Sequence, residues 1–245
     1  MGVRLAFAES SAGANGEAGR AALSARIAAL VGASADDRTL LARADRDGTA
    51  ALPKSGPARN VAAEALAVGQ TAGAALPAAP AFDAALADAA VLALREISPR
   101  IAVSTGTALA YALPQDARFS AFHGTVDARA AELLLILDPP VALKGEAGGV
   151  AIFEAGSGAV AGVRARSAAA ARLCAQAIAQ AVLPVAGEPT GEAVFDALSR
   201  GARVASALKT GGHLRAAVLS LRGRGRVIGP MDGDRLLRFG VSDWR

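Results

Sequence analysis

Apolar residues recur at helical spacing in five segments of the chain. The clearest segment runs from Phe82 to Ile97, with one apolar stripe made of Leu86, Ala90, Leu94 and Ile97. The other four segments are residues 17–31, 57–70, 167–182 and 191–208. Thr190 is a suitable N-cap for the last of them, and Gly211 a suitable C-terminal stop. The pattern predicts a helix in each segment.

Short apolar runs bounded by turn residues predict strands. They lie at residues 3–8, 101–103, 108–113, 118–122, 132–137, 149–154, 159–164, 214–221 and 226–228, with a short edge strand expected in 235–245. Residues 36–54 are predicted to form a hairpin, in which 39–44 pairs with 49–52 across an Asp-Gly turn. We therefore expect one α+β domain over residues 1–245, with mixed or antiparallel sheets.

The composition indicates a core of small side chains. Hydrophobic residues make up 53% of the chain, but aromatic residues only 4%. The single cysteine, Cys174, excludes an internal disulfide and is predicted to be an inert buried thiol. No apolar run reaches the roughly 18 residues of a membrane span, and no secretory segment is visible at the start. We expect a soluble protein of the cytoplasm.

Positive charge is concentrated near the end of the chain. The net charge is +4, and basic residues clearly outnumber acidic ones from Arg200 onward. Such an excess can attract phosphates or nucleic acid. Because no aromatic residues are interleaved to stack on bases, a solvated arginine-rich face is favoured over a nucleic-acid surface.

A polar turn is the most informative candidate for chemistry. Ser104-Thr105-Gly106-Thr107 lies between two apolar strands, where backbone N–H groups and hydroxyls can hold a phosphate or a carbonyl. An ordinary hairpin turn explains the same residues. His123 and His213 have no ligand-like neighbours in the sequence, which argues against zinc. A structural hydrogen bond is the expected role of His213, and Asp45 and Asp47 are assigned to a turn rather than to a metal.

The order of elements from about Phe82 to Gly229 resembles the flavin transferase family ApbE, and more closely its smaller prokaryotic relatives. In those relatives a strand, an Asn-Gly-Gly-Asp turn, an apolar strand and an Arg-Phe strand follow one another. Here the same succession is 101–103, 104–107, 108–113 and Arg118-Phe119. The Ala-rich helix at 171–182 and the closing helix, strand and Arg-rich hairpin at 197–229 are also similar. The resemblance implies an ApbE-like fold and a flavin nucleotide, FAD or FMN, as ligand.

The chain departs from this family where the family holds its metal. Thr107 stands in place of the turn aspartate, Arg172 in place of a helix aspartate, and Gln176 in place of a threonine. The family's carboxylate and threonine ligands hold Mg²⁺, whereas arginine has no acceptor atom to offer. A guanidinium can instead pair with phosphate directly. The departures predict a site without metal and the loss of flavin transfer. Its predicted residues are Ser104, Thr105, Gly106, Thr107, Arg172 and Gln176.

Three functions remain open at this point. The first is a divergent ApbE-like protein that binds a phosphate-bearing cofactor, with or without catalysis. The second is a non-enzymatic accessory or assembly protein that meets a partner or forms a homodimer. The third is an RNA-associated protein that uses the C-terminal arginines.

Overall fold

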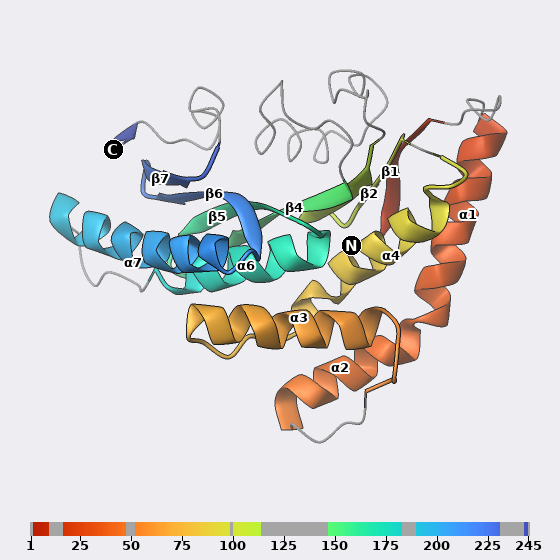
Figure 1. Cartoon of the computed structure of the whole chain (residues 1–245), viewed down its shortest axis with the longest axis horizontal. Helices are drawn as coiled ribbons and strands as arrows, with labels where there is room; N and C mark the ends of the chain where they lie inside the picture. The colour runs from red at the N-terminus through yellow and green to blue at the C-terminus, as the bar shows by residue number, and fades with distance from the viewer. Residues whose placement is uncertain are drawn as a thin grey trace.

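The computed structural model describes residues 2–9, 17–47, 52–98, 100–113, 147–182, 190–230 and 243–244, and its architecture is α+β. An antiparallel sheet forms one layer, and helices pack against one of its faces (Figure 1). The strands are β1 (Arg4–Glu9), β2 (Arg100–Ser104), β3 (Ala108–Ala112), β4 (Ala147–Glu154), β5 (Val160–Ala165), β6 (Leu214–Leu221), β7 (Arg224–Ile228) and β8 (Asp243–Trp244). From β1 to β7 each strand pairs antiparallel with the next, and β8 pairs parallel with β7.

Helices lie in two layers beneath the sheet, and the first helix, α1 (Glu17–Ala33), runs down one side of both layers (Figure 1). The others are α2 (Ala35–Asp47), α3 (Pro57–Ala72), α4 (Phe82–Leu94), α6 (Ala168–Gln180) and α7 (Gly191–Thr210), and a 3-10 turn, η1 (Ala79–Ala81), precedes α4. Helices α4, α6 and α7 pack on the sheet, whereas α3 packs on these helices from below (Figure 1). Helix α6 is therefore enclosed between the sheet and α3. None of the helices in the described ranges is both long and apolar enough to cross a membrane.

All five helices predicted from periodicity are confirmed, with boundaries that differ by a few residues. The expected caps of α7 are also present. The Thr190 side chain accepts a hydrogen bond from the Ala193 N–H, and the Gly211 N–H donates to the carbonyl of Ala207. The predicted strands in 3–8, 101–113, 149–164 and 214–228 are confirmed as well. Those predicted at 118–122 and 132–137 lie outside the described residues, as does most of the predicted tail strand at 235–245.

The hairpin predicted at residues 36–54 is wrong, because residues 35–47 form helix α2. Asp36 and Asp37 lie in its first turn and Arg46 in its last, an arrangement that complements the helix dipole. Leu41 is completely buried against the neighbouring helices. Asp45 belongs to no hairpin turn, since its carboxylate accepts hydrogen bonds from the N–H groups of Ala78 and Ala79 at 2.9 and 2.7 Å.

Two smaller predictions concern the core. The stripe of α4 is buried at Leu86, Ala90 and Leu94, but Ile97 is 40% exposed, because the helix ends before it. Cys174 is completely buried in α6, as predicted, and burial raises the pKa of its thiol. The thiol therefore stays protonated and unreactive.

Small residues let the central helix approach the sheet closely. Seven of the buried positions of α6 are alanine, and Gly149 of β4 lies directly against its first residue, Ala168. A Cβ atom added at Gly149 would lie 2.0 Å from the Ala168 nitrogen. The backbone contact of β4 with α6 fixes the distance between the helix N-terminus and the sheet. It therefore also fixes the position of the side chains of α6.

Candidate functional site

The predicted polar turn links β2 to β3, and some of its hydrogen-bonding groups bond to each other within the turn. The Thr105 N–H donates to the Ala108 carbonyl at 2.8 Å, and the Ala108 N–H donates to the Thr105 hydroxyl oxygen at 3.1 Å. The Thr105 hydroxyl is also 3.3 Å from that carbonyl. Gly106 has φ of 83°, a conformation that favours glycine. Thr105 thus shapes the turn and has no spare donor for a ligand.

The donors that remain are at the tip of the turn. No hydrogen bond among the described residues uses the N–H of Gly106 or Thr107. Thr107 is exposed and Gly106 partly so, whereas Ser104 is almost fully buried at the end of β2. Two adjacent N–H groups in a turn with a left-handed residue make a small concavity suited to an anion.

Arg172 and Gln176 lie one helical turn apart on α6 and contact each other. The Arg172 guanidinium donates to Oε1 of Gln176 at 3.3 Å. Its central carbon also lies 4.4 Å from the centroid of the Phe153 ring, on β4. Gln176 is buried, with 3% exposure, and orients the guanidinium through its amide oxygen.

Strand β4 connects Arg172 with the turn. The Ile152 N–H donates to the Thr107 carbonyl at 2.9 Å. The Arg172 guanidinium lies over the ring of the next residue, Phe153. The guanidinium and the turn therefore lie at the same end of the sheet. No direct hydrogen bond joins them within the described residues.

Arg172 is a partly buried cation without a counter-ion among the described residues. Burial lowers the pKa of its guanidinium to about 10, so the group remains charged at neutral pH. Its polar partner in this part of the chain is a neutral amide, and its other contact is a phenyl ring. A charge removed from water in this way is costly unless an anion joins it.

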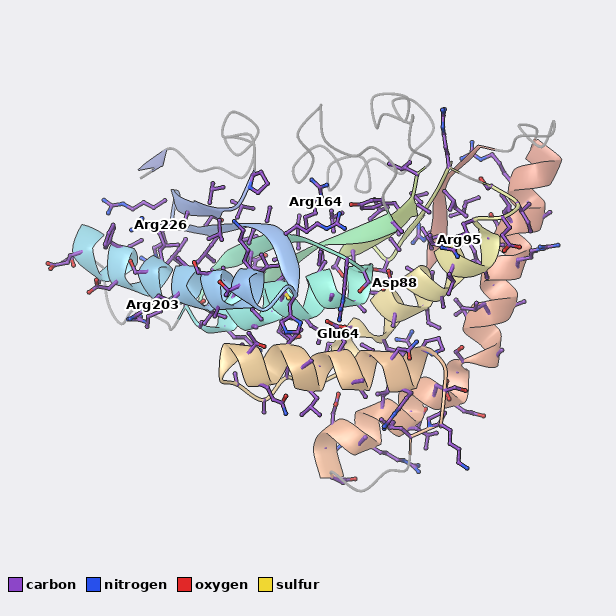
Figure 2. The ribbon with its side chains drawn as sticks, viewed as in Figure 1. Glu64, Asp88, Arg95, Arg164, Arg203 and Arg226 are labelled. Atoms are coloured by element: carbon purple, nitrogen blue, oxygen red, sulfur yellow. The ribbon has the colours of Figure 1, made fainter. Side chains whose placement is uncertain are left out.

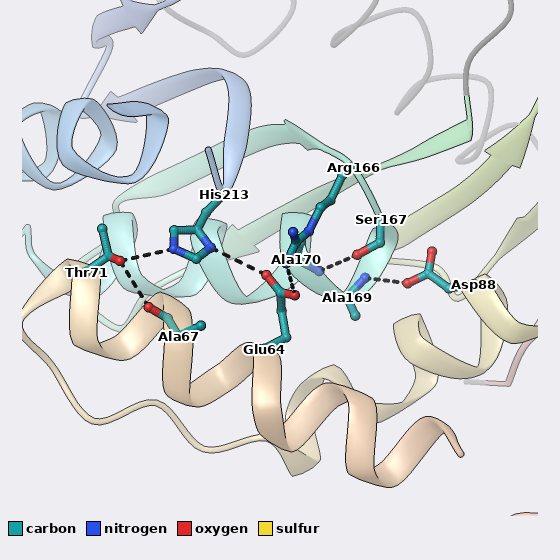
Figure 3. A network of polar contacts seen from close by, with 9 residues as sticks. All are labelled: Glu64, Ala67, Thr71, Asp88, Arg166, Ser167, Ala169, Ala170 and His213. Atoms are coloured by element: carbon teal, nitrogen blue, oxygen red, sulfur yellow. Dashed lines mark hydrogen bonds and ion pairs between the residues drawn. The ribbon is translucent and has the colours of Figure 1, made fainter. Parts of the chain in front are cut away.

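A second polar cluster, which the sequence did not indicate, joins α3, α4 and the N-terminus of α6 (Figure 3). The two carboxylate oxygens of Asp88 accept the N–H groups of Ala168 and Ala169 at 2.8 and 2.9 Å. The hydroxyl of Ser167 accepts from Ala170 at 3.1 Å. Asp88 thus caps α6 from another helix.

Glu64 of α3 is the other acid of this cluster. Its Oε2 accepts from the Arg166 guanidinium at 2.5 Å, and its Oε1 lies 3.6 Å from Nδ1 of His213 (Figure 3). Nε2 of His213 lies 3.0 Å from the Thr71 hydroxyl, which is also 3.0 Å from the Ala67 carbonyl. Because that hydroxyl donates to the carbonyl, Nε2 of His213 carries a hydrogen and donates to Thr71. The expected structural hydrogen bond of His213 is confirmed.

The pKa of Asp88 makes stability depend on pH. Burial, reinforced by the charge of Glu64, raises the pKa from 3.8 to about 7, although the two N–H donors oppose this rise. Between these values the folded chain binds more protons than the unfolded chain, so Asp88 lowers stability as pH increases, by at most about 1.4 kcal/mol per pH unit.

An Asp88→Asn variant should therefore lose this dependence. It gives up one acceptor and is less stable than the wild type at acidic pH, but the difference between the two should shrink as pH rises from 4 to 7. Urea unfolding of both proteins across this range measures the difference. A difference that stays constant with pH would contradict the raised pKa.

Two arginines of β7 contact α7: Arg224 donates to the Gly191 carbonyl at 2.8 Å, and Arg226 lies over the Phe195 ring. The Arg226 guanidinium lies 4.3 Å from the ring centroid of Phe195, which is 45% exposed. Figure 2 shows Arg203 and Arg226 at this end of the molecule, away from Glu64 and Asp88. Glu192 and Asp196 of α7 flank the same ring in sequence. The aromatic ring that meets these arginines is thus already covered by a guanidinium.

Metal ligands do not converge in the described ranges, where no group of three or more His, Cys, Asp and Glu residues could hold an ion. No protein-family model matches the chain. A search of curated proteins finds no similar sequence. The resemblance to ApbE therefore stays a prediction, and the functional argument depends on the geometry described above.

Proposed function

We propose that this protein is a divergent ApbE-like protein that binds a phosphate-bearing small molecule, such as FMN or FAD, without a metal. The phosphate lies between the Arg172 guanidinium and the N–H groups of Gly106 and Thr107. The observation that carries this proposal is the partly buried Arg172 cation, which has no acidic partner among the described residues and lies at the same end of the sheet as the turn.

The chemistry of the residues favours phosphate over a neutral ligand. A planar guanidinium binds two phosphate oxygens at once, and backbone N–H groups bind a third. Phe153 and Gln176 keep the guanidinium in one orientation, which reduces the entropy lost on binding. Thr105 supports the turn through its hydrogen bonds with Ala108, and Ser104 is buried at the end of β2.

The same residues argue against metal-dependent flavin transfer. Positions at which the resemblance places Mg²⁺ ligands carry Thr107, Arg172 and Gln176, and a guanidinium repels a divalent cation. The proposal is therefore binding with that reaction lost. A cytoplasmic location belongs to the proposal too, since a single buried cysteine suits a reducing compartment.

Calorimetric titration with FMN and with riboflavin, in the presence of EDTA, tests the proposal. The two ligands share the flavin ring and differ in the phosphate, so FMN should bind at least about tenfold more tightly than riboflavin. FAD and ADP should bind as well, because both carry a pyrophosphate. A strict requirement for Mg²⁺, or equal affinities for FMN and riboflavin, would refute it.

The two alternative functions, an assembly protein and an RNA-associated protein, predict different experimental results. An assembly protein would form a stable dimer in light scattering and show no response to any of these nucleotides. An RNA-binding protein would retain RNA with a steep dependence on salt. The contact of Arg226 with Phe195 favours neither, because the guanidinium already covers the face of that ring.

A further inference from the structure

A cavity of about 440 Å³ lies between α3, α4 and the N-terminus of α6. Its wall is mostly apolar and is built from small residues, among them Ala85, Ala89, Ala93 and Ala169. Cavities of this size hold small organic molecules in many proteins. It shares no lining residue with the turn at 104–107 or with Arg172.

The polar groups of this cavity are mainly hydrogen-bond acceptors. Glu64, Asp88, Asn60 and Ser167 lie in its wall, and none of its lining residues, all in the described part of the chain, is basic. Oε1 of Glu64 is buried and has no hydrogen-bond partner among the described residues. Nδ1 of His213 lies 3.6 Å from this oxygen. Because the oxygen has almost no exposed surface, a molecule in the cavity meets the carboxylate of Asp88 rather than Oε1 of Glu64.

The donors that usually attract anions are already occupied here. A helix N-terminus normally binds anions through its first N–H groups. In α6 these groups are taken by Asp88, which accepts from Ala168 and Ala169, and by Ser167, which accepts from Ala170. An anionic ligand would find these backbone donors occupied and would meet two acidic side chains, Asp88 and Glu64.

The two acids of the cavity, Glu64 and Asp88, differ in their basic neighbours. Arg166 pairs with Oε2 of Glu64, and His213 lies 3.6 Å from its Oε1, whereas no basic side chain among the described residues contacts Asp88. Figure 3 shows Arg166 and His213 next to Glu64, and Asp88 on the other side of Ala169 and Ala170, at the N-terminus of α6. The cavity itself, as far as the described residues line it, contributes no cation to this pair.

We propose that this cavity binds a small organic cation, in which a primary ammonium group is attached to an apolar body. The ammonium donates to Asp88, the charge of Glu64 adds to the negative potential there, and the apolar body lies against the alanines of α4. Asn60 and Ser167 complete the polar end of the site. This inference does not depend on the phosphate site.

Three probes of one shape and different charge test the inference: benzylamine, benzyl alcohol and benzoate. Each is titrated into the ¹⁵N-labelled protein at a pH just above 8 and at millimolar concentration, with amide shifts as the readout. Benzylamine should shift the amides of the cavity wall, and benzoate should not. Benzyl alcohol should bind about tenfold more weakly or worse, because it lacks the charge. Equal shifts from all three probes, or none from benzylamine, would overturn the proposal.

Variants locate the binding. Ala89→Phe fills the cavity and should abolish the response to benzylamine, whereas Ala62→Phe, whose residue lines a different cavity on α3, should leave it unchanged. Asp88→Asn should weaken benzylamine binding about tenfold while the response to benzyl alcohol stays the same. A response to benzylamine that survives Ala89→Phe places the binding elsewhere and refutes the site. If a variant fails to fold, the titrations of the wild-type protein with benzylamine, benzyl alcohol and benzoate still test whether the cavity prefers a cation.

Discussion

A Gly149→Val substitution is expected to destabilise the fold by about 3 kcal/mol or more, which is the upper range for overpacking in a core. The reason is that the new Cβ would lie 2.0 Å from the nitrogen and 2.3 Å from the Cα of Ala168, and these are backbone atoms that no rotamer change can move. The N-terminus of α6 would have to move away from the sheet, and the cap supplied by Asp88, which belongs to α4, would be lost.

Urea denaturation measures this effect, with Gly156→Ala as the matched control. Gly156 lies in the turn between β4 and β5 and keeps an ordinary φ, and a Cβ added there would meet no atom within 4 Å. The milder Gly149→Ala change should already lower the unfolding midpoint clearly, while the control should not. Equal midpoints for the two alanine variants would contradict the close approach of β4 to α6.

The second large effect is expected at Arg172. Replacing it with glutamine should weaken FMN binding by roughly tenfold to a hundredfold, because a charge-assisted hydrogen bond contributes about 1.5–3 kcal/mol. Arg172→Lys keeps the charge but loses the planar fork, so its affinity should fall between those of the wild type and the glutamine variant. Calorimetry in EDTA gives the three affinities.

Arg226→Gln is the matched control for this change. Arg226 also lies on a phenyl ring, that of Phe195 at 4.3 Å, but it belongs to β7 and not to the proposed site. Its replacement removes one positive charge from the molecule and should leave FMN affinity nearly unchanged. If both variants lose affinity equally, the attraction comes from net charge and not from a site at Arg172.

Periodicity and capping residues are sufficient to predict most of the described helices and strands. Thr190 and Gly211 fix the ends of α7, and the Gly-Ser-Gly turn at 156–158 fixes the hairpin of β4 and β5. The hairpin prediction at 36–54 is wrong because the acidic first turn at Asp36 and Asp37 favours a helix more strongly than the Asp-Gly step favours a turn. Burial of Leu41 against other helices, a tertiary effect, decides in favour of helix there.

The candidate sites differ in how far sequence could predict them. The turn at 104–107 is visible in the sequence as a polar break between apolar strands. The hydrogen bond of the Thr105 hydroxyl with the Ala108 N–H, which takes this hydroxyl away from a ligand, is not visible there. Contacts such as Arg166 with Glu64 and Asp88 with Ala168 join residues 102 and 80 positions apart, and no local pattern encodes them. The available signal is that Glu64 and Asp88 each have only apolar residues within three positions on either side.

The most direct test of the phosphate site is an NMR titration of the ¹⁵N-labelled protein with FMN in EDTA. The amides of Gly106 and Thr107 and the Nε–H of Arg172 should shift together, with one common dissociation constant, and riboflavin should not reproduce these shifts. Shifts confined to other parts of the chain, or no shifts before Mg²⁺ is added, would contradict the site.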